Sequence, residues 1–253
     1  MQFVFGTGSL FGTALTDATG TAIANPSPVK FGELQDVSLD MSRDIKPLYG
    51  QNMMPVAVGG GKMKFDWKCK FARLNGRIFN DLFFGQTLNA GTLQGILNDT
   101  TGAAIPATPF TITPVIPSAG VWARDLGVID ANGVPMTRVA AAPATGQYSV
   151  TAGAYLFAAA DTGKIVFISF AYTATVAAAK QVVFTNQPMG YVPTFGIDLA
   201  IIYNGKAANL RFNQNVSSKL TFSPKQDDFG VVDMDFTSFA DAAGNIGYIQ
   251  LSE

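Results

Sequence analysis

Ten consecutive residues alternate strictly between polar and apolar side chains: Lys62-Met63-Lys64-Phe65-Asp66-Trp67-Lys68-Cys69-Lys70-Phe71. Successive side chains of a β-strand point to opposite faces of the sheet, so this alternation predicts a strand with two unlike faces. One face presents lysines and an aspartate, whereas the other presents only Met, Phe, Trp and Cys. Because ionised groups are costly to bury without partners, we expect the charged face to contact water and the face of Trp67 to enter a core.

A second alternating strand comes shortly before it: Val37-Ser38-Leu39-Asp40-Met41-Ser42. If the two strands pair, Asp36 and Asp40 lie across from lysines and offset their repulsion. The connection from Arg43 to Gly61 is far longer than a usual hairpin loop, so we expect a structureless loop with a functional role. Its many apolar residues leave two interpretations open: packing against its own chain, or docking on another copy.

A short helix is expected after the charged strand, over residues 75–84. Asn75 is a favourable N-cap, and Gly85 is a favourable residue just beyond the C-terminus. An apolar stripe at helical spacing lies between them and comprises Ile78, Phe79, Leu82 and Phe83. Such a stripe predicts a helix that covers an open face of a sheet.

The composition changes at about Gly91 and again at about Gly190, and Ala, Thr, Gly and Pro dominate between these points. We therefore expect segments 1–95 and 189–253 to form one β domain, with 96–188 inserted as a small β-sandwich-like module. The first thirty residues indicate an extended arm with one or two strands. Further strands are expected at 110–116, 121–129, 146–151, 154–158, 164–173, 181–185, 197–203, 207–213, 217–223, 230–238 and 245–251. The expected fold class is mainly β with one short helix.

Composition excludes several kinds of chemistry. The chain has 253 residues, a formal charge of −1, only 14% charged residues, no His and a single Cys. These counts exclude a Ser-His-Asp triad, a His-bearing zinc site, a Cys-rich metal site and an intrachain disulfide. A near-neutral chain without basic runs is not expected to bind nucleic acid tightly. The longest uncharged apolar run, Ile165–Ala179, is shorter than the ~20 residues of a membrane helix, so no membrane segment is expected.

Few residues form a constellation that carries chemistry. Asp233 and Asp235 share one strand face, which predicts a solvated polar face rather than an acid–base pair. Residues 130–133 predict a β-turn rather than a calcium loop, because the series of oxygen ligands is missing. Residues 59–61 are all glycine but lack the following Gly-Lys-Ser/Thr of a phosphate loop, and Cys69 predicts a buried thiol. We therefore expect no catalytic, cofactor-binding or metal-ligating residues and no enzymatic activity.

Short motifs follow one another around these elements in a characteristic order. They are Phe31-Gly32-Glu33-Leu34-Gln35-Asp36-Val37-Ser38, Lys46-Pro47-Leu48-Tyr49-Gly50-Gln51, Pro55-Val56-Ala57, Phe83-Phe84-Gly85, Lys225-x-Asp227-Asp228-Phe229 and Phe239-x-Asp241-x-x-Gly244. With the Gly-rich start, the alternating strand and the short helix, this order resembles the major tail (tail tube) proteins of long-tailed bacteriophages. The resemblance covers roughly residues 1–90 and 190–253.

The resemblance implies a tail-tube-type β-sandwich or barrel whose subunits form hexameric rings that stack into a tube. DNA passes through the lumen without specific binding, strands 37–42 and 62–71 line that lumen, and a loop over 44–61 contacts the next ring. The implied stacking residues are Lys46, Leu48, Tyr49, Met53, Met54 and Val56. The implied lumen-facing residues are Asp36, Asp40, Lys62, Lys64, Asp66, Lys68, Asp233 and Asp235. The resemblance further implies no cofactor, partnership with tape measure and tail-end proteins, and a place in the virion tail after synthesis in the host cytoplasm.

A conduit must not retain DNA, yet the alternating strand places four lysines on one face. Either the aspartates of this face balance them, or the lysines pair with acids at subunit interfaces. Two other functions also stay open. One is another β-rich virion component, such as a capsid decoration or tail-tip protein. The other is a carbohydrate-binding module, for which the inserted segment offers the aromatic residues Trp122, Tyr148, Tyr155 and Tyr172, although they fit a core equally well.

Overall fold

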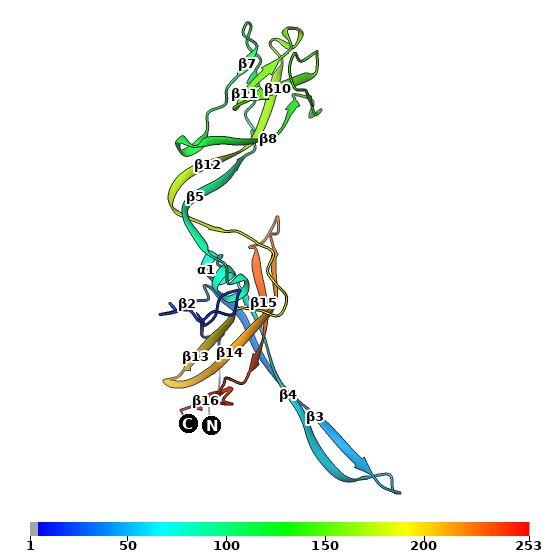
Figure 1. Ribbon diagram of the computed structural model, residues 1–253, viewed down its shortest axis with the longest axis vertical. Coiled ribbons are helices and arrows are strands. Elements are labelled where there is room, and N and C mark those ends of the chain that lie inside the picture. Colours follow the sequence, from blue (N-terminus) through cyan, green and yellow to red (C-terminus); the bar gives the residue numbers. More distant parts are fainter. Residues whose placement is uncertain (1–4, 253) are drawn as a thin grey trace. The chain divides into compact units, whose positions relative to one another are not determined.

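Strands make up most of the computed structural model, which describes residues 5–252 (Figure 1). They form mostly antiparallel sheets alongside one short helix, so the expected mainly β fold is confirmed. The chain divides into two units. The first comprises residues up to Leu88 and from Val182 onward, and the second, inserted unit comprises Asn89–Gln181. Both ends of the inserted unit lie earlier in the chain than the expected segment 96–188.

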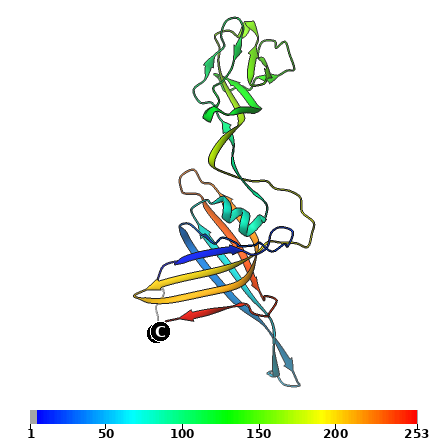
Figure 2. The ribbon, with the colours of Figure 1, turned by 60° about the vertical axis from the view of Figure 1, so that its left-hand side comes forward.

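The first unit contains one eight-stranded antiparallel sheet built from both ends of the chain (Figure 2). Its strands follow the order β2 (Val29–Lys30), β1 (Ser9–Ala14), β13 (Thr194–Tyr203), β14 (Lys206–Ser223), β15 (Val231–Phe239), β4 (Pro55–Phe71) and β3 (Leu34–Tyr49), and β16 (Gly247–Leu251) also pairs with β14. The one or two strands expected in the first thirty residues are present as β1 and β2, and every residue of β1 pairs with β13, so this segment belongs to the sheet. β14 is one strand where the sequence predicts two, at 207–213 and 217–223, and its pairing with β15 contains a bulge near Ser217.

One face of this sheet forms the core of the first unit. The predicted alternation of β4 is confirmed toward its C-terminal end, where Trp67, Cys69 and Phe71 are each at most 1% exposed, whereas Met63 on the same face is 47% exposed and lies outside the core. Trp67 stacks on Phe236 with ring centroids 5.6 Å apart and meets Phe212 edge-on at 5.2 Å. Burial of each large apolar side chain contributes roughly 1.5–3 kcal/mol, so this face is a major source of stability.

A chain of hydrogen bonds crosses the same core. The indole Nε1–H of Trp67 donates to Ser238 Oγ at 3.1 Å, and the Ser238 hydroxyl donates to Asn215 Oδ1 at 2.6 Å. The Asn215 side-chain N–H donates in turn to the carbonyl oxygen of Phe195 at 2.9 Å. Ser238 and Asn215 are both buried, so their polar atoms depend on these partners. The chain of bonds links β4, β15, β14 and β13.

The short helix lies over the apolar face of the sheet. Helix α1 (Gly76–Phe79) continues into a π-helical turn, η1 (Asn80–Phe84). Both predicted ends are confirmed: the Asn75 side chain accepts the N–H of Arg77 at 3.0 Å, and Gly85 adopts the left-handed conformation that ends the helix. Leu82 is fully buried against β1, at a position where a Cβ on Gly12 would come within 2.6 Å of its side chain.

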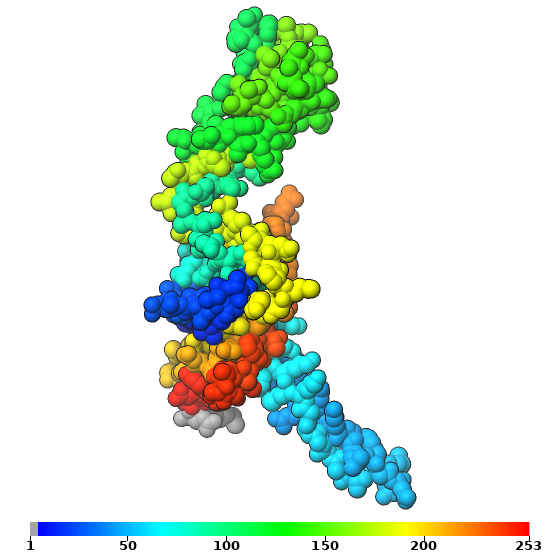
Figure 3. Space-filling model, viewed as in Figure 1, coloured from blue at the N-terminus to red at the C-terminus, as the bar shows by residue number. Residues whose placement is uncertain are grey.

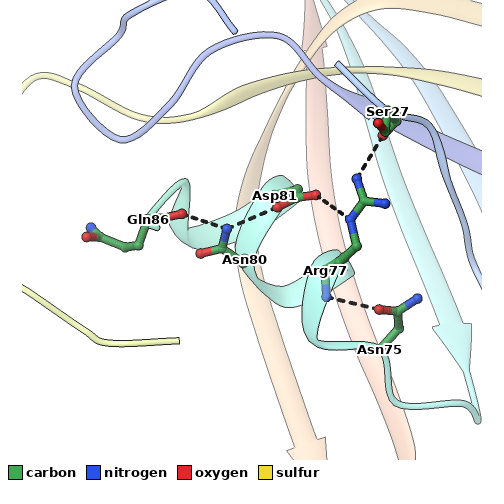
Figure 4. A network of polar contacts seen from close by, with 6 residues as sticks. All are labelled: Ser27, Asn75, Arg77, Asn80, Asp81 and Gln86. Atoms are coloured by element: carbon green, nitrogen blue, oxygen red, sulfur yellow. Dashed lines mark hydrogen bonds and ion pairs between the residues drawn. The ribbon is translucent and has the colours of Figure 1, made fainter. Parts of the chain in front are cut away.

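Polar contacts fix the helix to neighbouring segments of the chain (Figure 4). Arg77 donates from Nε to Asp81 Oδ2 at 3.3 Å and from Nη2 to the carbonyl oxygen of Ser27 at 3.4 Å. The buried Asn80 donates from Nδ2 to the carbonyl oxygen of Gln86 at 2.7 Å. The helix is thereby tied both to the segment before β2 and to the segment that follows the helix.

The inserted unit has two four-stranded sheets around a core of its own. One contains β5 (Leu88–Leu97), β12 (Ile165–Val182), β6 (Ala103–Ala104) and β8 (Val121–Asp130), and the other contains β7 (Thr111–Ile112), β11 (Ala154–Phe157), β10 (Gln147–Thr151) and β9 (Thr137–Arg138). β5 was not predicted from the sequence. The predicted strand at 181–185 is not separate, because β12 runs on to Val182.

The aromatic residues proposed for carbohydrate stacking belong to this second core. Tyr148, Tyr155 and Tyr172 are buried, and the carboxylate of Asp125 accepts hydrogen bonds from the hydroxyls of Tyr148 at 2.7 Å and Tyr155 at 3.1 Å. Trp122 donates from Nε1 to the Tyr155 hydroxyl at 3.3 Å. Burial is the main reason that the pKa of Tyr155 rises to about 12. These side chains pack and bond internally, and the three tyrosine rings are not exposed for stacking on a sugar.

Candidate functional site

The charged face of the sheet is the first candidate surface. It lies opposite the core and is formed by alternate residues of β3, β4, β15 and β14. In the register of these strands, Lys70 lies between Asp233 on one side and Asp36 on the other. Asp235 lies between Lys68 on β4 and Lys219 on β14. Acidic and basic side chains therefore alternate from strand to strand.

One predicted pairing on this face is wrong. Asp40 does not lie across from a lysine. The register is uninterrupted from Asp36, which faces Lys70, to Asp40, which faces Asp66, because both pairs of residues are four apart along their strands. Asp66 accepts a hydrogen bond from the Thr237 hydroxyl at 2.7 Å. Along β4, Asp66 is also flanked on the same face by lysines two residues before and after it. Asp66 thus meets opposite charge along its own strand, whereas Lys64 and Lys68 lie diagonally across from Asp40.

The charged face, defined over the ranges 34–42, 62–71, 217–223 and 231–239, carries equal numbers of acids and bases. The acids are Asp36, Asp40, Asp66, Asp233 and Asp235, and the bases are Lys62, Lys64, Lys68, Lys70 and Lys219. All eight residues that the resemblance implies for the lumen lie on this one face. Lys219 was not predicted, because the bulge near Ser217 reverses which residues of β14 point to the charged side.

The second candidate surface is a hairpin where the sequence predicts a loop. β3 continues to Tyr49 and β4 begins at Pro55, so the expected structureless connection over 43–61 is a two-stranded ribbon with a short turn (Figure 1). In the space-filling view this segment projects from the rest of the first unit (Figure 3). The glycines at 59–61 lie in extended strand and pair with β3 or flank its bulge. The two segments continue the pairing of β3 with β4, and the turn between them lacks a common two-residue hairpin signal.

The ribbon exposes apolar side chains along its length. Seven of them are at least 60% exposed: Ile45, Leu48, Tyr49, Met53, Met54, Val56 and Val58. Lys46 is also exposed. The interpretation that this segment packs against its own chain is therefore wrong for these residues. An isolated two-stranded hairpin is marginally stable in water, and exposed apolar surfaces of this kind are typical of sites that contact another molecule.

The remaining candidates for chemistry are structural. Asp130 Oδ1 accepts the N–H groups of Asn132 and Val134, both at 2.9 Å, which confirms the predicted β-turn. Cys69 donates from Sγ to the carbonyl oxygen of Met234 at 3.4 Å, and burial, followed by the charge of Asp235, raises its thiol pKa to about 12. Within residues 5–252, no three Cys, Asp or Glu side chains come together as a metal site.

No protein-family model matches the chain, and no curated protein shows significant similarity to it. In the part of the chain that the structure describes, no helix has both the length and the apolar character needed to cross a membrane.

Proposed function

We propose that the protein is a structural subunit that polymerises head to tail into the tail tube of a long-tailed bacteriophage. Rings of subunits, hexameric by resemblance, stack into a conduit for DNA ejection. The tape measure protein and the tail-end proteins are the further partners, the virion tail is the site of action, and the role is not enzymatic.

The observation that carries this proposal is the exposed ribbon at the end of β3 and β4. Its apolar side chains project beyond the core of the subunit that supports them. A contact between this surface and a different surface of the next copy is heterologous, and heterologous contacts that do not close produce open-ended filaments. The ribbon is a continuation of β3 and β4, which also bear part of the charged face. In the proposed tube these two strands therefore contribute both to the stacking of rings and to the wall of the conduit.

The sheet supports ring formation. β3 stands at one end of the strand order and β2 at the other, so within residues 5–252 the sheet is open. Open edges present unpaired backbone groups, and closure of sheets across neighbouring subunits satisfies them. A wall of this kind has one face in water and one face against a core, as the sheet does here.

Electron microscopy of the purified protein tests the proposal. We expect long hollow filaments that grow with concentration or after addition of preformed seeds. Discrete rings or clusters that never extend would instead favour a capsid decoration or tail-tip role. A protein that stays monomeric at high concentration, by sedimentation, would contradict both.

A further inference from the structure

The lysines of the charged face attract DNA, whereas a tail tube must let DNA pass. The inference drawn from this face rests on the proposed function. Five lysines gathered on one face would attract a polyanion, because protein affinity for DNA comes largely from contacts between cationic side chains and phosphates. We infer that the aspartates of β3 and β15 act as fixed counterions to these lysines, so that the face has no net charge and duplex DNA slides past it without being held.

The strand register places the counterions. Asp233 and Asp235 on β15 lie directly across from Lys70 and Lys68, and Asp36 approaches Lys70 from the opposite strand. Directly opposed residues of an antiparallel pair have Cβ atoms about 4.5–5.5 Å apart. The Debye length at physiological salt is about 8 Å, so the Cβ atoms of these opposed pairs lie closer together than the distance over which mobile ions screen exposed charges.

One aspartate of the charged face has a lysine on each neighbouring strand. Asp235 lies between two lysines from different strands, Lys68 and Lys219, and so neutralises part of the field of both. Lys68, Lys70 and Lys219 are exposed, whereas Asp233 and Asp235 are half-buried between their neighbours. A phosphate that approaches a lysine from solvent therefore meets a carboxylate on the adjoining strand.

The inference predicts that removal of carboxylates converts the face into a DNA-binding surface. The test variant is Asp36→Asn/Asp233→Asn/Asp235→Asn, which preserves side-chain size and leaves three lysine charges uncompensated. The matched control is Glu33→Gln/Asp44→Asn/Asp227→Asn, which changes net charge equally at exposed positions that have no partner in the strand register of the charged face.

The experiment measures binding of fluorescently labelled 30-base-pair duplex DNA to unassembled subunits, whose state is checked by sedimentation. At 50 mM salt we expect the test variant to bind at least tenfold more tightly than wild type, and the control variant to bind like wild type. Neutralisation of three phosphates predicts that the affinity of the test variant falls ~40-fold between 50 and 200 mM salt. Circular dichroism confirms that the variants are folded.

Two outcomes would overturn the inference. Wild-type subunits that bind DNA as tightly as the test variant would show that the carboxylates do not neutralise the lysines. Equal binding by the test and control variants would show that net charge, rather than this face, controls affinity. Because the assay uses free subunits, a failure to form filaments would contradict the proposed tail tube and would leave this result unaffected.

Discussion

Replacement of Ser238 by Ala tests whether the buried hydrogen-bond chain organises the sheet. The Ser238 hydroxyl accepts from Trp67 Nε1 and donates to Asn215 Oδ1, and the serine and both partner residues are buried. Ser238→Ala leaves one donor and one acceptor without partners, and each such group costs about 1–3 kcal/mol. We therefore expect the free energy of unfolding of the first unit to fall by roughly 2–6 kcal/mol.

The matched control is Ser218→Ala, since the exposed Ser218 hydroxyl donates to the carbonyl oxygen of Asp235 at 3.2 Å. This change should cost within about 0.5 kcal/mol, as for most surface substitutions. Urea unfolding followed by far-ultraviolet circular dichroism measures both. Trp67→Phe removes the indole donor, so Ser238→Ala should cost about 1 kcal/mol less in that background. Equal costs for the two serine variants would refute the argument.

Three further predictions follow from the ribbon, the inserted unit and the thiol. Replacing residues 47–60 with a tight Asn-Gly turn should give a folded subunit that never forms long filaments in electron micrographs, because the apolar ribbon is lost; normal tubes would exclude the ribbon from assembly. Replacing Asn89–Gln181 with a short Gly-Ser linker should preserve both folding and filaments, since Thr185 Oγ1 donates to Gln86 Oε1 at 2.8 Å and so holds the two chain ends together; an unfolded remainder by circular dichroism would contradict this. Cys69 should resist a thiol reagent at pH 8 and react fully in urea, because burial raises its pKa; rapid reaction in the native protein would disprove the burial of β4.

The sequence predicts those elements that are determined by residues close together in the chain. Strict alternation over Lys62–Phe71 predicts the face of the sheet on which each side chain of β4 lies, since the pleat of a strand has period two wherever it lies. Asn75 and Gly85 predict both helix ends, because capping satisfies backbone groups within a single turn. The aromatic residues of the inserted segment fit two interpretations, because the sequence does not distinguish a tyrosine buried in a core from an exposed tyrosine that stacks on a sugar.

Other features depend on residues far apart in the chain. The hairpin of β3 and β4 was predicted as a loop, because the turn after Tyr49 lacks the common two-residue signal. The register of β3 against β4 decides that Asp40 faces Asp66 rather than a lysine, and a bulge in β14 turns Lys219 toward the charged face. Bulges are set by the pairing of whole strands, so a one-residue pattern does not reveal them.

The order of residues alone therefore determined a mainly β chain with one short helix, a strand with one wet and one dry face, and the absence of histidine chemistry. Only the folded structure brought Asp233 and Asp235 from the end of the chain beside the lysines of β4, and only it left the ribbon without a partner in its own subunit. The physical reason is that alternation specifies the face of each side chain, whereas neighbours across a sheet follow from strand order and register. These arise when distant segments pair and bury a common core.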